Sequence, residues 1–170
     1  MKATDLTRTQ SATILGGAAL MLSLAMGMRQ SLGLLQPHVI RDLGITAADY
    51  SLALAIQNIV WGITQPFVGL LVDRIGARPV AVTGVTVYAL GLAVMAIAPS
   101  ALVLTLGAGL CIGLALSCTA SNLAMNVTAR TVTPARRSVA MGAVSAAGSL
   151  GLVVASPLAQ AMIVTGGWQL

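Results

Sequence analysis

Five long apolar stretches constrain this chain more than any other feature of its sequence. A helix of about 20 mostly apolar residues spans the hydrocarbon core of a bilayer. Within that core the backbone N–H and C=O groups must bond to the protein itself, so such a stretch forms a helix. The sequence therefore predicts an all-α polytopic membrane protein with five transmembrane helices. These helices are expected over about residues 11–36, 49–72, 79–98, 101–127 and 138–165.

The composition excludes the other broad classes of protein. The chain is 57% hydrophobic and only 8% charged, whereas a soluble domain is about 25% charged. Disordered chains are polar and charged, so disorder is excluded as well. The nine basic residues are too few and too scattered for a phosphate-binding stripe, so we expect no nucleic-acid partner.

The basic residues predict an orientation. Cytoplasmic segments of membrane proteins carry an excess of Lys and Arg. If the N-terminus lies in the cytoplasm as a tail over residues 1–10, Arg41 is the one basic residue of the outer loops, and Asp42, Asp49 and Trp168 also lie on the outer side. The cytoplasmic segments then hold Lys2, Arg8, Arg74, Arg78, Arg130, Arg136 and Arg137.

Local signals predict where helices begin, end and meet. Thr46 and Asp49 have the spacing of a capping box, which places a helix start there. We place the end of the first helix at Gln36 and therefore His38 in the outer loop. In the fifth stretch small residues recur at i, i+4, which suits close helix packing. The pairs are Gly142 with Ala146 and Gly151 with Ala155.

The connection between the second and third stretches reads GLLVDRIGARP over residues 69–79. Gly69 would let its helix approach a neighbour closely, and Gly76 would permit the tight reversal. Asp73 lies at a helix end, where it can meet the positively charged N-terminus of another helix. Arg74 and Arg78 would anchor the connection in the cytoplasm. The residues alone leave two interpretations open: a functional loop, or a charged hairpin that obeys the orientation rule.

Arg29 is the one charged residue placed deep in a stretch. Inserting an arginine at this depth costs at least about 2.5–3.5 kcal/mol, and such residues usually face a cavity. Its position seven residues before Gln36 is about 10 Å of helix, so its side chain could also reach the outer interface. The alternative is that Arg29 faces a central cavity. There its guanidinium would form two-point hydrogen bonds with an anionic substrate such as a carboxylate.

Uncharged polar residues concentrate in the second and fourth stretches. They either hydrogen-bond one helix to another or line a substrate cavity. We take Asn58 and Asn122 as candidate substrate-binding residues. The polar residues considered are Gln57, Asn58, Gln65, Ser117, Thr119, Ser121, Asn122 and Asn126.

The run GLLVDRIGAR resembles the G-x-x-x-D-R-x-G-R-R loop that joins the second and third helices of the major facilitator superfamily. The runs RQSLGLL and PARRSVAMG and the terminal GGW are similar to bacterial members related to the monocarboxylate and oxalate/formate carriers. The resemblance covers about residues 11–170. It implies a carrier of two six-helix halves, with the first and fourth helices lining the cavity and the third peripheral. It also implies that the loop gates conformational change, through Gly69, Asp73, Arg74, Gly76 and Arg78.

Two departures from the family pattern narrow the expected function. Many proton-coupled members have an Arg in the fourth helix, four residues before a Gly. If that Gly is Gly113, the Arg position holds Gly109. The G-P-x-x-G-G element of drug/proton antiporters is also absent from the fifth stretch, so drug efflux is disfavoured.

Together these features predict the N-terminal part of a secondary carrier, truncated before its sixth helix. It would move a small organic anion, such as a monocarboxylate, by alternating access across a bacterial inner membrane. Its partners would be the lipid bilayer, the anion and the missing C-terminal half. The alternatives are a non-transporting membrane scaffold or remnant, and a half-size carrier that dimerises. No catalytic triad, metal-ligand cluster or phosphate loop is present in the sequence, so we expect no enzyme activity, metal or cofactor.

Overall fold

A computed structural model describes residues 7–119 and 121–166, and every regular element in these ranges is helical. Five helical stretches among them are long and apolar enough to cross a membrane, with residues 101–131 counted as one stretch. The all-α polytopic fold class is therefore confirmed. Residues 1–6 of the expected tail, with Lys2, and the expected outer-interface residue Trp168 lie outside the described residues. The elements are α1 (Arg8–Leu43), α2 (Ala47–Ile75), α3 (Ala77–Ala96), α4 (Ala101–Leu104), the π-helix η2 (Thr105–Cys111), α5 (Ile112–Thr119), α6 (Ser121–Thr131), the 3₁₀-helix η3 (Pro134–Arg136) and α7 (Arg137–Gly166).

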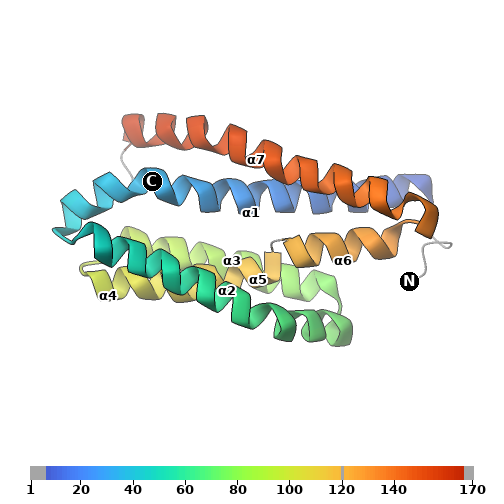
Figure 1. Cartoon of the computed structure of the whole chain (residues 1–170), viewed down its shortest axis with the longest axis horizontal. Coiled ribbons are helices and arrows are strands. Elements are labelled where there is room, and N and C mark those ends of the chain that lie inside the picture. The colour runs from blue at the N-terminus through green and yellow to red at the C-terminus, as the bar shows by residue number, and fades with distance from the viewer. Residues whose placement is uncertain (1–6, 120, 167–170) are drawn as a thin grey trace.

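The helices form two packed groups (Figure 1). In one group α7 lies along α1, and α6 packs against both. In the other, α2 and α3 pack against the fourth stretch, from α4 to α5. The main core joins buried side chains of both groups, among them Leu32 of α1, Tyr50 of α2, Tyr88 of α3 and Leu116 of α5. Many large apolar side chains point outward instead, as expected for a surface that faces lipid tails.

The first helix runs further than its sequence predicts. Pro37 lies inside α1, which continues to Leu43 and ends at Gly44 with φ +63°. The predicted end at Gln36 is wrong, and so is the outer-loop position of His38, which is a half-buried residue of the helix. In a bilayer, ending a helix would leave several backbone groups without partners, whereas an internal proline removes a single hydrogen bond. The chain therefore passes through Pro37 without a break.

The predicted capping box opens α2. The backbone N–H of Asp49 donates to the Thr46 hydroxyl at 3.1 Å, and the N–H of Thr46 donates to the Asp49 carboxylate at 2.9 Å. These bonds supply partners for N–H groups that the first turn of a helix cannot bond internally. The short connection between α1 and α2 is thereby fixed at both ends.

The fourth stretch is helical as predicted but contains the π segment η2. Its glycines allow close contact with α2. A Cβ on Gly109 would lie 3.1 Å from the Ala53 carbonyl oxygen, and one on Gly113 would lie 2.8 Å from the Gln57 carbonyl oxygen. The buried Gln57 side chain donates to the Ala108 carbonyl at 2.8 Å. Gly109 therefore faces α2, and an arginine at this position has no space.

Small residues bring α1 and α7 together. A Cβ on Gly27 would lie 2.7 Å from the Ala155 Cβ, and a Cβ on Gly151 would overlap the Ser23 carbonyl oxygen. The predicted packing role of the Gly151 and Ala155 pair is confirmed. Gly142 differs, because no described atom lies within 4 Å of the position that its Cβ would take.

The two α7 glycines provide a matched pair of variants. Gly151→Ala forces the helices apart and should lower stability by about 1–3 kcal/mol, the usual cost of overpacking. Gly142→Ala should leave stability unchanged or raise it by up to about 1 kcal/mol, because alanine favours helices over glycine. Thermal unfolding of both variants in lipid nanodiscs measures the difference. Equal effects would contradict the α1–α7 contact.

Candidate functional site

One face of α2 carries a row of polar side chains. Asn58, Gln65 and Asp73 are spaced seven and eight residues apart, which places them on the same side of a helix. Each of the three hydrogen-bonds to a side chain of α1 or α6. Gly62 and Gly69 lie between them in the same register. We call these five residues the α2 polar face.

The first contact of the α2 polar face joins two predicted substrate residues. The Arg29 Nη2 donates to the Asn58 Oδ1 at 2.7 Å, and the Asn58 Nδ2 donates to the Leu54 carbonyl at 2.8 Å. The Arg29 Cζ lies 5.3 Å from the ring centroid of Trp61, within the range of a cation–π contact. The guanidinium is thus held between an amide and an indole ring of α2.

The full length of α1 places Arg29 deep in the membrane. Arg29 lies 14 residues before Leu43, which is about 21 Å of helix and not the 10 Å expected from an end at Gln36. The hydrocarbon core is about 30 Å thick. α1 itself is about 54 Å long and Arg29 lies about 5 Å from its middle, so Arg29 falls within this core when the helix crosses it.

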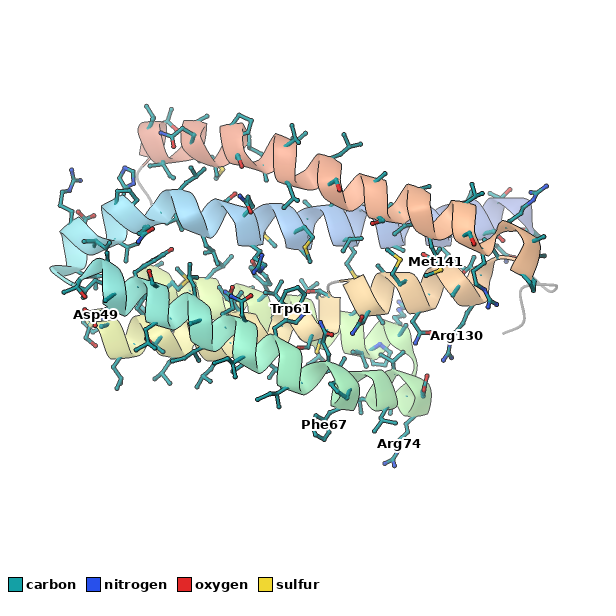
Figure 2. All side chains as sticks on the ribbon, viewed as in Figure 1. Asp49, Trp61, Phe67, Arg74, Arg130 and Met141 are labelled. Atoms are coloured by element: carbon teal, nitrogen blue, oxygen red, sulfur yellow. The ribbon has the colours of Figure 1, made fainter. Side chains whose placement is uncertain are left out.

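No acidic side chain in the described ranges lies beside Arg29. Asp42 is in the last turn of α1, Asp49 is in the first turn of α2, and Asp73 lies near the opposite end of α2. Figure 2 shows Asp49 at one end of the bundle and Trp61 between the two ends. A cation in a low-dielectric region is costly without an opposite charge. Within the described residues the site is therefore electropositive.

Asn122 does not join Arg29 and Asn58. Its Nδ2 donates to the Gln65 Oε1 at 2.8 Å, and Gln65 lies seven residues beyond Asn58, about 10 Å along α2. This second contact borders a hollow of about 460 Å³ between α2 and α6. The hollow is lined by Gly62, Gln65, Pro66, Gly69, Asn122, Met125 and Asn126.

The third contact is an ion pair at the end of α2. The Arg130 Nη2 lies 2.6 Å from the Asp73 Oδ1, and the two side chains are 60% and 55% exposed. The expected partner of Asp73 was a helix N-terminus, but in the described residues its carboxylate meets Arg130 in the last turn of α6. Figure 2 places Arg130 at the same end of the bundle as Arg74.

The glycines of the loop have different environments. Gly76 has φ +90°, a conformation that L side chains rarely adopt, so the predicted reversal is confirmed. The predicted close approach at Gly69 is wrong for the described residues, because nothing lies within 4 Å of its would-be Cβ. Gly69 lines the open hollow instead. Arg74 and Arg78 are exposed beside Gly76.

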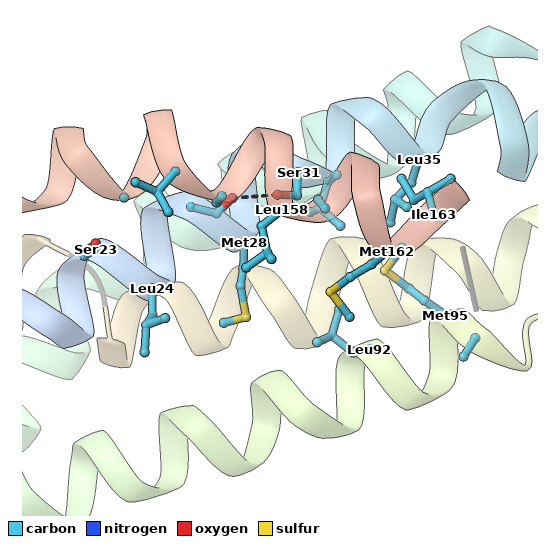
Figure 3. A pocket seen from close by; sticks show the side chains of 17 residues that line it. Ser23, Leu24, Met28, Ser31, Leu35, Leu92, Met95, Leu158, Met162 and Ile163 are labelled. Atoms are coloured by element: carbon cyan, nitrogen blue, oxygen red, sulfur yellow. Dashed lines mark hydrogen bonds between the residues drawn. The ribbon is translucent and has the colours of Figure 1, made fainter. Parts of the chain in front are cut away.

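A second hollow, of about 360 Å³, lies between α1, α3 and α7 (Figure 3). Its lining is apolar apart from the hydroxyls of Ser23 and Ser31, and the Ser31 hydroxyl donates to the Gly27 carbonyl at 3.0 Å. Leu35, Leu158 and other aliphatic or methionine side chains form the remaining wall. This hollow offers an anion no charged group, so Arg29 with its contacts on the α2 polar face is the better candidate site.

A comparison with protein families matches the Major Facilitator Superfamily over residues 18–170. The chain belongs to this superfamily. No curated protein matches the chain. Members of the Major Facilitator Superfamily are transporters and not enzymes, and the membrane-length helices agree with a multi-pass half bundle of that fold. Transport is therefore the general activity that membership of the superfamily supports for this chain.

The sequence does not single out three residues whose surroundings in the structure bear on the candidate site. Arg130 was assigned only to membrane orientation, although it pairs with Asp73. Trp61 was not considered as a partner of Arg29, although it lies three residues beyond Asn58 on the same helix. The sequence does not single out Tyr88, a buried residue of α3, because the third stretch contains no Asn, Gln or charge. The spacing of Gly84, Tyr88 and Gly91 places all three on one face of α3, and this face is buried.

Proposed function

We propose that this chain is the N-terminal part of a secondary carrier that moves a small organic anion, such as a monocarboxylate, by alternating access. The observation that carries the proposal is Arg29, a cation at membrane depth that Asn58 and Trp61 hold in place. Within the described residues no carboxylate offsets its charge. An anionic substrate would supply that opposite charge when it binds.

The geometry of Arg29 favours a carboxylate. A guanidinium is planar and presents its donors as a fork that matches the two oxygens of a carboxylate. The bond to Asn58 occupies only one of its nitrogens. We propose that Asn58 orients Arg29, and that Asn122 with Gln65 lines the path of the substrate about 10 Å further along α2.

Substitutions at Arg29 test the anion assignment. Arg29→Lys keeps the charge but loses the fork. Losing one charge-assisted hydrogen bond costs about 1.5–3 kcal/mol, so binding of small organic acids should weaken about 10- to 150-fold. Arg29→Gln should weaken binding further. The measurement is the binding of radiolabelled formate, acetate and oxalate to the intact protein expressed from its own gene.

The matched control is Arg41→Gln, at the exposed outer end of α1, which should leave affinity unchanged. If both Arg29 variants bind every acid as tightly as the parent, the anion assignment is wrong and only general transport remains. A parent protein that neither binds nor transports any solute would favour the non-transporting scaffold.

We further propose that the loop between α2 and α3 gates conformational change and does not bind substrate. The Asp73–Arg130 pair would latch the ends of α2 and α6, with Gly69, Arg74, Gly76 and Arg78 completing the loop. Exposed ion pairs contribute only about 0–1 kcal/mol to stability, so the Asp73–Arg130 pair adds little to the stability of the fold. Such a weak ion pair is compatible with a role in conformational change.

Asp73→Asn should therefore lower the transport rate while substrate affinity and thermal stability stay nearly unchanged. Arg130→Gln should have the same effect, and the double variant should be no slower than either single variant, because all three lose the same pair. Uptake and binding measured on the same protein separate the two quantities. A large loss of affinity with an intact rate would contradict the gating role.

We propose that the protein lies in a bacterial inner membrane with its N-terminus in the cytoplasm, and the placement of the basic residues supports this orientation. Arg74 and Arg130 lie in the last turns of α2 and α6. Arg136 ends η3, and Arg137 begins α7. In a chain whose two native cysteines are changed to alanine, Ser138→Cys should be labelled only from the cytoplasm. Ala48→Cys should be labelled only from outside. The reverse pattern would overturn the orientation.

A further inference from the structure

Four buried side-chain atoms in the described ranges have no hydrogen-bond partner. They are the Arg29 Nε, the Trp61 Nε1, the Tyr88 hydroxyl and the His38 Nδ1. Native proteins rarely leave a buried polar group unpaired, because its lost hydration is not replaced. The Arg29 and Trp61 side chains are in contact with each other, and Trp61 packs against the core cluster that contains Tyr88.

The three donors come from three neighbouring helices. Arg29 belongs to α1, Trp61 to α2 and Tyr88 to α3. The Trp61 ring lies 5.3 Å from the Arg29 Cζ and packs against the core cluster that contains Tyr88. Tyr88 is only 4% exposed. The unpaired donors of Trp61 and Tyr88 thus belong to packed side chains, one of which is in direct contact with the proposed anion-binding residue.

The chemistry of the three groups specifies what is missing. A guanidinium N–H and an indole N–H only donate hydrogen bonds, and a tyrosine hydroxyl can donate one. An ionised carboxylate only accepts, through two oxygens with about four lone-pair sites. Asn58 already occupies the Nη2 of Arg29, so the Nε edge is the edge that still lacks an acceptor.

We propose that Trp61 and Tyr88 bind the substrate carboxylate together with Arg29. The Arg29 Nε and the Trp61 Nε1 each donate to the carboxylate, and the Tyr88 hydroxyl donates a third hydrogen bond. The carboxylate reaches this edge from the side of the exposed Asn58. This inference rests on the proposed anion transport and adds two residues, from α2 and α3, to the binding site.

Phenylalanine substitutions test the inference, because they remove the donor and keep an aromatic ring. Trp61→Phe and Tyr88→Phe should each weaken binding of radiolabelled formate, acetate and oxalate about 10-fold, as expected for a lost hydrogen bond to a charged group. The thermal stability of the empty protein should stay the same or rise, because an unpaired buried donor is removed. The protein is the intact product of its own gene in lipid nanodiscs.

Tyr50→Phe is the matched control. Tyr50 is also buried, at 1% exposed, but its hydroxyl donates to the Leu32 carbonyl at 2.5 Å. Its loss should lower thermal stability and leave anion affinity unchanged. If Tyr88→Phe behaves like Tyr50→Phe, the Tyr88 hydroxyl is structural and its part of the inference is overturned.

The outcome at Arg29 separates this inference from the proposed function. If Arg29→Gln loses binding while both phenylalanine variants bind like the parent, the inference fails and the proposed function stands. If Arg29→Gln also binds like the parent, the anion assignment itself fails. Should the variants unfold, the indole ¹⁵N–H resonance of Trp61 in the parent still decides. It should move when acetate is added, and a resonance that stays fixed at saturating acetate would overturn the inference.

Discussion

The absence of water in the bilayer core is the constraint on which this structure depends. Polar side chains in the spans must find partners within the protein, and α2 is where most of those partners meet. Gln57 bonds to the backbone of the fourth stretch, while Asn58, Gln65 and Asp73 reach α1 and α6. One helix therefore connects both packed groups, by a close, glycine-rich contact on one side and by exposed side-chain hydrogen bonds on the other.

The two kinds of contact differ in how easily they can change. At Gly113 the backbones of two helices nearly touch, and separating them would lose packing along the whole contact. The α2 polar face makes few contacts and borders an open hollow, so a shift there breaks single side-chain bonds. The bundle therefore has a tightly packed contact on one side of α2 and a contact held by single side-chain bonds on the other.

The sequence predicts the membrane-length helices, the Thr46 capping box and the Gly76 turn, because each depends on neighbouring residues. The sequence does not predict the end of α1, because a proline usually ends a helix in a soluble protein. In a bilayer, ending the helix at Pro37 would leave several backbone groups without hydrogen-bond partners. That loss is larger than the single hydrogen bond that the proline removes. Asp73 with Arg130, and Arg29 with Trp61, could not be paired from the sequence because the partners lie 57 and 32 residues apart. Only the packing angles of the helices bring them together.

The π segment in the fourth stretch has a consequence for how that helix can twist. An α-helix turns about 100° per residue, so the one extra residue of a π turn rotates everything beyond it by about that angle. The α4 end therefore presents a different face to its neighbours than an unbroken α-helix would. Gln57 donates to Ala108 inside this segment. A buried amide of α2 thus bonds to the segment in which the backbone register of the fourth stretch changes.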